Sequence, residues 1–536
     1  MRLAASFVLA ALALTSPAIA KPKRKPAPKP AAPITAPQVH VVRGADGWRA
    51  DLAFDGSLLG WAVPLAHDHM RDLLLLVGER SDASVAASAP CGLRDSKELG
   101  DEHARLYRWR AAVPDRLELV ASGLKRGTLD AADLDGDGEE ECLLLREGRI
   151  ELVTTSPGSS GRVRAIVTDA ELGAPCCSPR IAWEDAAPED TALRLPLPGA
   201  FRTYRSGKDG LVKLVSEQAI PARLNAGADS VAVVSPVVHA IGRGSSGRMF
   251  FATEPEPLGK RRLRTMLIDP DGPEESRAVE RLVMFPEAER VVDSGFFVLD
   301  GAPVLVVTTT SADKLSLLGA KALRVYPLNG DRTRAGNEPL FAAKTDINLW
   351  QAATPAIVDL DRDGHQDLVL SYWKGLKNTV AAQETYRGAA SGIFLKAHTT
   401  SFDVENGDRG SMHFGEDMDG DGRPDLVLLA NKELLVFPGN PADRAAEKPV
   451  QSAPSRRVPL PTDLPGAGRS YVSMGLEGVS IGRSSGGPGT PHFLDLDGDG
   501  RPEAVFAGNG ESGSRIVVVF VRGSSPLPPS ATVGRH

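Results

Sequence analysis

The sequence has few aromatic residues, few cysteines, and no long hydrophobic run after its first twenty positions. Phe, Trp and Tyr make up 5% of the 536 residues. No segment after residue 20 approaches the roughly 20 apolar residues that a membrane-spanning helix needs. A basic excess is also lacking, because the formal net charge is −7. Phosphate contacts require a basic face, so the sequence predicts neither a nucleic-acid-binding protein nor a transmembrane span.

The four cysteines leave the redox chemistry open. They are Cys91, Cys142, Cys176 and Cys177, and none forms a C-x-x-C motif, so a thioredoxin-type role has no support. In an exported chain, four thiols allow three disulfide pairings. The adjacent Cys176 and Cys177 could each reach a different partner, giving bridges to Cys91 and Cys142, or could form a strained bridge with each other.

The N-terminus has the composition of an export signal followed by a tether. Arg2 precedes an apolar stretch from Leu3 to Leu14, and Ala18-Ile19-Ala20 offers a small-residue cleavage site. Frequent prolines then disfavour helix and sheet. We therefore predict an exported protein, periplasmic, at the cell surface or secreted. The predicted organisation is a signal peptide at 1–20, a Pro/Lys-rich linker at 21–44, a folded region at 45–525 and a tail at 526–536.

Glycine and proline are abundant, with 54 and 41 residues, and this composition favours short strands joined by tight turns. The expected fold class is all-β. Within it, a nine-residue pattern D-x-D-x-D-G-x-x-[DE] occurs four times: DLDGDGEEE at 133–141, DLDRDGHQD at 359–367, DMDGDGRPD at 417–425 and DLDGDGRPE at 495–503.

Such dense acidic loops are expected to hold calcium. Without a cation these carboxylates repel at close range, and calcium takes about six to eight oxygen ligands. Positions 1, 3, 5 and 9 offer carboxylates, position 7 a backbone carbonyl, and glycine at position 6 permits a positive φ. The predicted ligands of about four structural Ca²⁺ sites are Asp133, Asp135, Asp137, Glu139 and Glu141; Asp359, Asp361, Asp363, His365 and Asp367; Asp417, Asp419, Asp421, Arg423 and Asp425; and Asp495, Asp497, Asp499, Arg501 and Glu503.

Each motif continues into a short apolar run, CLLL, LVLSYW, LVLLA or AVFAG, which predicts a strand and excludes the helical calcium hand, whose loop closes at position 12. Similar runs without the full acid pattern follow Asp72, occur at 299–309 and, more weakly, at 247–254. We count seven repeats, with strands near positions 72, 141, 249, 304, 367, 425 and 503. The interval from 141 to 249 leaves room for an eighth repeat around 190–195. Repeats of this length suit the four-stranded blades of a β-propeller, most simply a seven-bladed one with calcium-binding hairpin loops.

The four motifs, together with Gly301-Ala302-Pro303, resemble the FG-GAP/VCBS-type repeats of integrin α-chain propellers and of many exported bacterial proteins. The resemblance covers residues from about 45 to 525 and is strong at four blades. It implies a β-propeller, usually seven-bladed, with each calcium in a hairpin loop on one face. The segment LAHDHMRD at 65–72 departs from the pattern because it lacks the alternating acids, so no metal is predicted there.

The leading functional hypothesis is a non-catalytic, calcium-stabilised binding module. Its partner would be a protein or an envelope or extracellular glycan, and we expect a monomer. The sequence GRSSG at 482–486 matches the G-x-S-x-G nucleophile elbow, but the GPGTP that follows cannot begin the required helix. Two alternatives are an exported hydrolase or lyase acting on polysaccharide or lipid, with catalytic groups on 376–416 and 440–492, and a calcium-dependent lectin.

Overall fold

The computed structural model contains two units, Met1–Ile34 and Thr35–His536, of which the first lies outside the described residues, together with the predicted signal peptide. The structure describes residues 36–64, 70–78, 103–125, 127–134, 140–146, 148–153, 163–168, 182–183, 192–197, 200–206, 212–219, 237–240, 248–255, 261–268, 278–284, 289–299, 302–311, 322–327, 338–345, 347, 353–374, 380–389, 394, 398–402, 409–430, 432–445, 447–461, 471–475, 478–482, 491–510 and 513–521.

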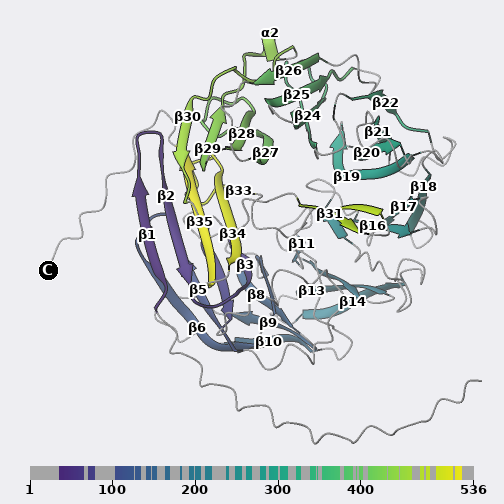
Figure 1. Ribbon diagram of the computed structural model, residues 1–536. Coiled ribbons are helices and arrows are strands. Elements are labelled where there is room, and N and C mark those ends of the chain that lie inside the picture. Colours follow the sequence, from purple (N-terminus) through teal and green to yellow (C-terminus); the bar gives the residue numbers. More distant parts are fainter. Residues whose placement is uncertain are drawn as a thin grey trace, which may run out of the picture. The chain divides into compact units, whose positions relative to one another are not determined.

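Over these residues the second unit is a β-propeller of antiparallel sheets, here called blades 1 to 8 (Figure 1). Blade 1 contains β3 (Leu58–Ala62), β4 (Leu73–Gly78), β5 (His103–Trp109) and β6 (Leu117–Lys125). Blade 2 contains β7 (Thr128–Ala132), β8 (Glu141–Arg146), β9 (Arg149–Val153) and β10 (Val163–Thr168). Blade 3 contains β11 (Ala182–Trp183), β12 (Ala192–Leu197), β13 (Ala200–Ser206) and β14 (Val212–Ala219). Blade 4 contains β15 (Val237–Ala240), β16 (Arg248–Pro255), β17 (Arg261–Ile268) and β18 (Ala278–Met284).

The later blades follow the same four-strand plan. Blade 5 contains β19 (Glu289–Leu299), β20 (Ala302–Ser311), β21 (Ala322–Pro327) and β22 (Phe341–Lys344). Blade 6 contains β23 (Thr354–Val358), β24 (Asp367–Lys374), β25 (Val380–Tyr386) and β26 (His398–Phe402). Blade 7 contains β27 (Arg409–Glu416), β28 (Asp425–Ala430), β29 (Glu433–Phe437) and β30 (Arg456–Pro459), with the short helix α2 (Ala442–Ala445) between its last two strands. The separate hairpin of β31 (Tyr471–Gly475) and β32 (Gly478–Gly482) precedes blade 8.

Blade 8 joins the two ends of the propeller. It contains β33 (His492–Leu494), β34 (Glu503–Gly510) and β35 (Gly513–Val521), followed in the sheet by β2 (Gly47–Phe54) and β1 (Gln38–Arg43) (Figure 1). Strand β2 pairs with β35 from Gly47 opposite Val521 to Phe54 opposite Ser514. Backbone hydrogen bonds between distant segments of the chain therefore close this blade.

Strand β1 corrects the predicted domain boundary. Residues 38–43 belong to the range predicted as linker, yet they pair with β2 along their whole length. Their sequence QVHVVR has no proline and places valines where they can pack, whereas the prolines that disfavour sheet lie earlier. The folded region thus begins before residue 45.

The second strands β4 and β28 contain continuous apolar runs because both of their faces are buried between blades. In β28, Leu426 and Leu428 pack in a core shared with blade 6, whereas Val427 and Leu429 pack in a core shared with blade 8. Alternate residues of β4 divide in the same way between cores shared with blades 8 and 2. Face-to-face packing of neighbouring blades therefore explains the continuous apolar runs.

The number of blades is eight among the described residues, so the predicted seven is wrong. All seven strands located from the sequence are present, and each is the second strand of its blade: β4, β8, β16, β20, β24, β28 and β34. The additional blade has β12 as its second strand, at the position left open around residues 190–195. It was missed because residues 184–191 lack the alternating D-x-D-x-D-G pattern and because its strand, ALRLPL, is interrupted by Arg194 and a proline.

Cys142 is a free thiol buried in the core between blades 1 and 2, so the proposed bridge to it does not form. Burial raises the pKa of this thiol to about 12, which keeps it protonated and unreactive. Cys91, Cys176 and Cys177 lie outside the described residues. In the part of the chain that the structure describes, no helix is long and apolar enough to cross a membrane.

Candidate metal centre

The four acidic motifs occupy the same place in four blades: each is the hairpin between the first and second strands. They join β7 to β8, β23 to β24, β27 to β28 and β33 to β34, so the strand–loop–strand prediction is confirmed. First strands of neighbouring blades contact each other, as β23 does with β27. The loops of blades 6, 7 and 8 therefore come from three consecutive blades.

In these three loops the acids at positions 1, 3 and 9 converge. One carboxylate oxygen from each acid lies within 4.8 Å of the others in each set: Asp359, Asp361 and Asp367; Asp417, Asp419 and Asp425; Asp495, Asp497 and Glu503. These sets are called clusters 6, 7 and 8 after their blades. In the loop of blade 2, Asp135, Asp137 and Glu139 lie outside the described residues, whereas Asp133 and Glu141 are described.

The acid at position 9 closes the loop in all four blades by accepting a hydrogen bond from the backbone N–H at position 2. The donor–acceptor distances are 2.7 Å for Leu134 to Glu141, 3.0 Å for Leu360 to Asp367, 2.9 Å for Met418 to Asp425 and 2.6 Å for Leu496 to Glu503. The first strand ends two residues before the donor, and the second strand begins at the acid itself. Because the hydrogen bond always joins residues seven positions apart, all four loops close at the same length.

Two glycines that sequence reasoning missed complete this closure. Gly388 N–H donates to Asp367 at 2.7 Å, and Gly439 N–H donates to Asp425 at 2.8 Å. Each glycine follows the third strand of its blade. A Cβ on Gly388 would lie 2.3 Å from the carbonyl oxygen of Gln366, so only glycine brings the backbone this close. A glycine two residues after the third strand is the signal that could have identified them.

Position 1 organises the turn, and glycine at position 6 makes the turn possible. Asp417 accepts from the N–H groups of Gly420, Asp421 and Gly422 at 2.7 to 3.0 Å. The φ of Gly422 is 78°, and the corresponding Gly364 and Gly500 have φ of 90° and 84°. The predicted positive φ at position 6 is confirmed in these three loops.

The position 5 acids lie outside the three clusters. Asp363, Asp421 and Asp499 accept hydrogen bonds of 2.8 to 2.9 Å from the backbone N–H of position 7, which is His365, Arg423 and Arg501 respectively. Asp421 and Asp499 also pair with the side chains of Arg423 and Arg501. In the loops of blades 6, 7 and 8 the structure thus brings together three of the four carboxylates predicted for the site.

Burial and the charge of neighbouring carboxylates make the three closing acids and Asp497 hard to ionise without a cation. Asp367, Asp425 and Glu503 are at most 4% exposed. Burial raises the pKa of Asp367 to about 6 and that of Asp425 to about 7. Burial, followed by the charge of neighbouring carboxylates, raises the pKa of Asp497 to about 6 and that of Glu503 to about 9. A bound cation would remove the repulsion and favour the ionised forms.

These pKa values predict how the metal-free protein responds to pH. Unfolded Asp and Glu titrate near pH 4. A carboxyl with a raised folded-state pKa stabilises the fold fully below about pH 4, and this contribution is lost as pH rises through the folded pKa values of about 6, 7 and 9. We therefore expect the thermal midpoint in metal-free buffer to fall between pH 5 and 9. The variant Glu503→Gln, which resembles the protonated acid, should reduce the fall above pH 7. A midpoint that rises across this range would contradict the assignment.

The donor atoms fit a hard divalent cation. Each cluster offers oxygen alone, the ligand type that calcium and magnesium prefer, and none offers the sulfur or imidazole that favours zinc or copper. In cluster 6, Asp359 Oδ1 and Asp361 Oδ1 are buried and accept no hydrogen bond. Unpaired buried carboxylate oxygens carry a desolvation penalty that coordination of a cation would offset.

Blade 1 closes its hairpin differently. Asp72, at the closing position, accepts hydrogen bonds from Arg110 Nε at 2.7 Å and Nη2 at 3.0 Å. Arg108 Nη1 lies 3.5 Å from the same carboxylate. Arginine thus supplies positive charge at the closing acid of the blade for which no metal is predicted.

No family model and no curated protein matches the chain. Among solved structures, it is similar to an endo-arabinase from Bacteroides thetaiotaomicron, at 16% identity over 51% of this chain and 90% of that one, with a TM-score of 0.24. It is also similar to BBS1N, solved in complex with ARL6DN, at 14% identity over 75% and 93%, with a TM-score of 0.28. A lectin from Agrocybe aegerita that recognises non-reducing terminal N-acetylglucosamine has 11% identity over 83% and 94%, with a TM-score of 0.35. Similarity at this level gives no information about the function of this chain.

Proposed function

We propose that this protein is an exported, calcium-braced β-propeller that acts as a non-catalytic binding module for a protein or a glycan. The observation that carries the proposal is the recurrence of one three-carboxylate cluster at the same hairpin of three consecutive blades. A catalytic site is ordinarily a single constellation, whereas a structural device can be repeated blade by blade. Repetition therefore favours a role in holding the blades.

Calcium would supply the positive charge that lets the three carboxylates of each cluster stay ionised side by side. The residues of the chain hold the loop in its closed conformation. Asp425 ties the loop of blade 7 to Met418 at its start and to Gly439 after the third strand. Its cluster partners Asp417 and Asp419 accept from backbone N–H groups within the turn. Calcium binding is thereby linked to the geometry of the first three strands.

The topology suggests where a partner would bind. The acidic loops join first to second strands, so the connections from second to third strands emerge at the opposite end of each blade. Those connections differ greatly in length: the one in blade 1 runs from residue 79 to 102, whereas β28 and β29 of blade 7 are separated by two residues. Loops of varied length on a rigid scaffold are a common place for recognition. We place the binding surface there, away from the calcium loops.

The experiment that tests the function is a panel of immobilised polysaccharides and envelope extracts, run with calcium and after chelation. We expect retention of a glycan or a protein without any product release. Because calcium would act through stability, retention should survive brief chelation at low temperature and disappear near the lowered unfolding temperature. Release of soluble product would favour the hydrolase or lyase instead. Immediate loss of glycan on chelation, with the fold intact by circular dichroism, would favour the calcium-dependent lectin.

A further inference from the structure

Arg362 occupies an unusual backbone position in the loop of blade 6. Its φ is 60°, in the left-handed region that side chains with a Cβ rarely adopt. The same position 4 is glycine in the other three motifs, and Gly420 and Gly498 have φ of 81° and 74° there. Glycine would therefore suit the turn of blade 6 better than arginine. The presence of arginine at this position is therefore not explained by the conformation of its own turn.

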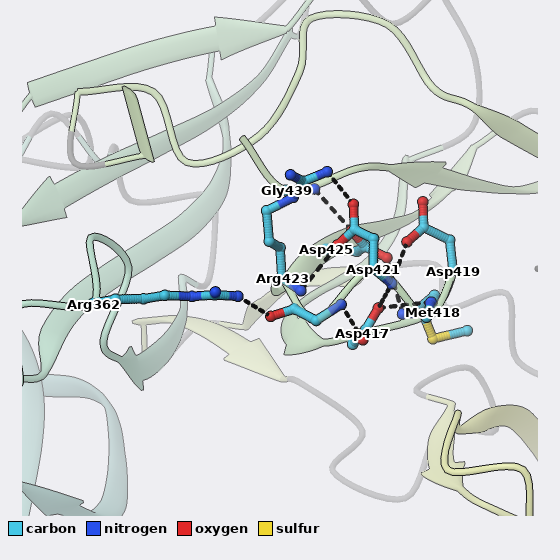
Figure 2. Close-up of polar contacts among 10 residues, drawn as sticks. Arg362, Asp417, Met418, Asp419, Asp421, Arg423, Asp425 and Gly439 are labelled. Atoms are coloured by element: carbon cyan, nitrogen blue, oxygen red, sulfur yellow. Dashed lines mark hydrogen bonds and ion pairs between the residues drawn. The ribbon is translucent and has the colours of Figure 1, made fainter. Parts of the chain in front are cut away.

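The side chain of Arg362 crosses to the next blade. Its Nη2 donates to the carbonyl oxygen of Gly422 at 2.8 Å, in the loop that carries cluster 7 (Figure 2). The N–H of Gly422 donates in turn to Asp417 Oδ2 at 2.7 Å. Gly422 thus links the guanidinium of Arg362, from blade 6, to Asp417 of cluster 7. The contact therefore joins the loop of blade 6 to the loop of blade 7.

A second arginine spans the next seam. A Cβ built on Gly420, in the loop of blade 7, would lie 2.9 Å from Cδ of Arg501 in the loop of blade 8. The guanidinium of Arg501 is held by Asp499, with Nε at 2.9 Å from Oδ2. The stem of Arg501 therefore lies against the turn that presents cluster 7 while its head stays bound within the loop of cluster 8.

We propose that these arginines couple calcium binding between neighbouring blades, so that clusters 6, 7 and 8 load cooperatively. This inference rests on the proposed calcium function and adds to it a regulatory property of the same sites. Calcium in cluster 6 would order its turn and with it the base of Arg362, which then holds Gly422 in place. Cluster 7 would bind next with less loss of conformational entropy, which is positive coupling.

The expected size of the coupling is modest. The contact between Arg362 and Gly422 is solvent-exposed, and a single hydrogen bond of this kind changes an equilibrium by about two- to tenfold. We expect emptying cluster 7 to weaken calcium binding at cluster 6 by that factor. Reciprocity requires the same factor in the other direction.

The test is a double-mutant cycle read by hydrogen exchange of the full-length protein. Peptides covering residues 359–367 report the calcium concentration that half-protects the loop of blade 6. The variant Asp419→Asn disables cluster 7. In the protein that keeps Arg362, Asp419→Asn should raise the half-protecting calcium concentration two- to tenfold. In an Arg362→Gly background, Asp419→Asn should leave that concentration unchanged. Arg362→Gly installs the residue of the other loops, so its fold is expected to persist; Arg362→Asn, which tolerates positive φ but is too short to reach Gly422, should behave alike.

Arg444→Ala is the matched control, because it removes an exposed positive charge of blade 7 outside the loops and should leave the coupling intact. An Asp419→Asn effect of equal size with and without Arg362, or no effect in the Arg362 protein, would overturn the coupling while leaving calcium binding in place. If calcium protects none of the three loops in the unaltered protein, the proposed function itself fails, and the coupling with it.

Discussion

Adding about 10 mM calcium to the metal-free protein is expected to raise its thermal midpoint by about 4 to 8 °C. Calcium sites of extracellular type bind with dissociation constants of about 10⁻⁴ to 10⁻³ M. At that calcium concentration each site would contribute about 1.4 to 2.7 kcal/mol, and three clusters about 4 to 8 kcal/mol. A folded region of this size has an unfolding entropy of about 1 kcal/mol per kelvin, which gives the stated shift. Differential scanning calorimetry measures it directly.

Two controls separate specific binding from a general effect of salt. Magnesium at the same concentration should give a smaller shift, because it demands tight octahedral geometry and loses its water reluctantly. The variant Asp497→Ala removes one carboxylate of cluster 8. It should lower the stoichiometry in equilibrium dialysis by one ion and remove roughly a third of the calcium-dependent shift. A midpoint that stays constant across millimolar calcium would refute the calcium-braced propeller.

Replacing Asp425 with alanine is expected to lower the free energy of unfolding by about 3 to 5 kcal/mol. Asp425 is 0% exposed, and its two oxygens accept from Met418 N–H at 2.9 Å and Gly439 N–H at 2.8 Å. Alanine leaves both backbone groups buried without a partner, and each costs about 1 to 3 kcal/mol. Urea unfolding in metal-free buffer isolates this structural loss, and calcium should then restore little of it at blade 7.

Two further variants of blade 7 serve as matched controls for Asp425→Ala. Asp425→Asn keeps one acceptor oxygen, so it should retain part of the stability while still disabling cluster 7 for calcium. Asp443→Ala removes an exposed acid of the same blade and should change the free energy by no more than about 0.5 kcal/mol. A loss below about 1 kcal/mol for Asp425→Ala would mean that the closing acid does not hold the hairpin, and the account of the loop would fall.

The spacing of the acidic motifs was enough to predict the local structure. Gly422 at position 6 has the positive φ that the pattern requires, and Asp425 at position 9 begins the strand that its apolar continuation predicts. These features depend on residues within nine positions of each other, where backbone geometry leaves few alternatives. For the same reason seven second strands could be located from the sequence, and the eighth, at β12, could be suspected.

Contacts between distant residues were beyond such reasoning. The pairing of Gly388 with Asp367 spans a whole hairpin, and that of Arg362 with Gly422 spans two blades. Cys142 could have paired in several ways, and burial between blades 1 and 2 leaves it a free thiol. The hydrogen bond from Arg110 to Asp72 depends on where the third strand of blade 1 ends.

The sequence by itself determined the repeated unit: an acidic turn, closed at its ninth residue, leading into a strand buried on both faces. Only the tertiary structure decided how many units there are, that β2 completes blade 8 beside β35, and which side chains connect one loop to the next. The physical reason is the range of the interactions. A turn is governed by neighbouring dihedral angles and charges, whereas blade count and seam contacts follow from packing between residues that can lie hundreds of positions apart.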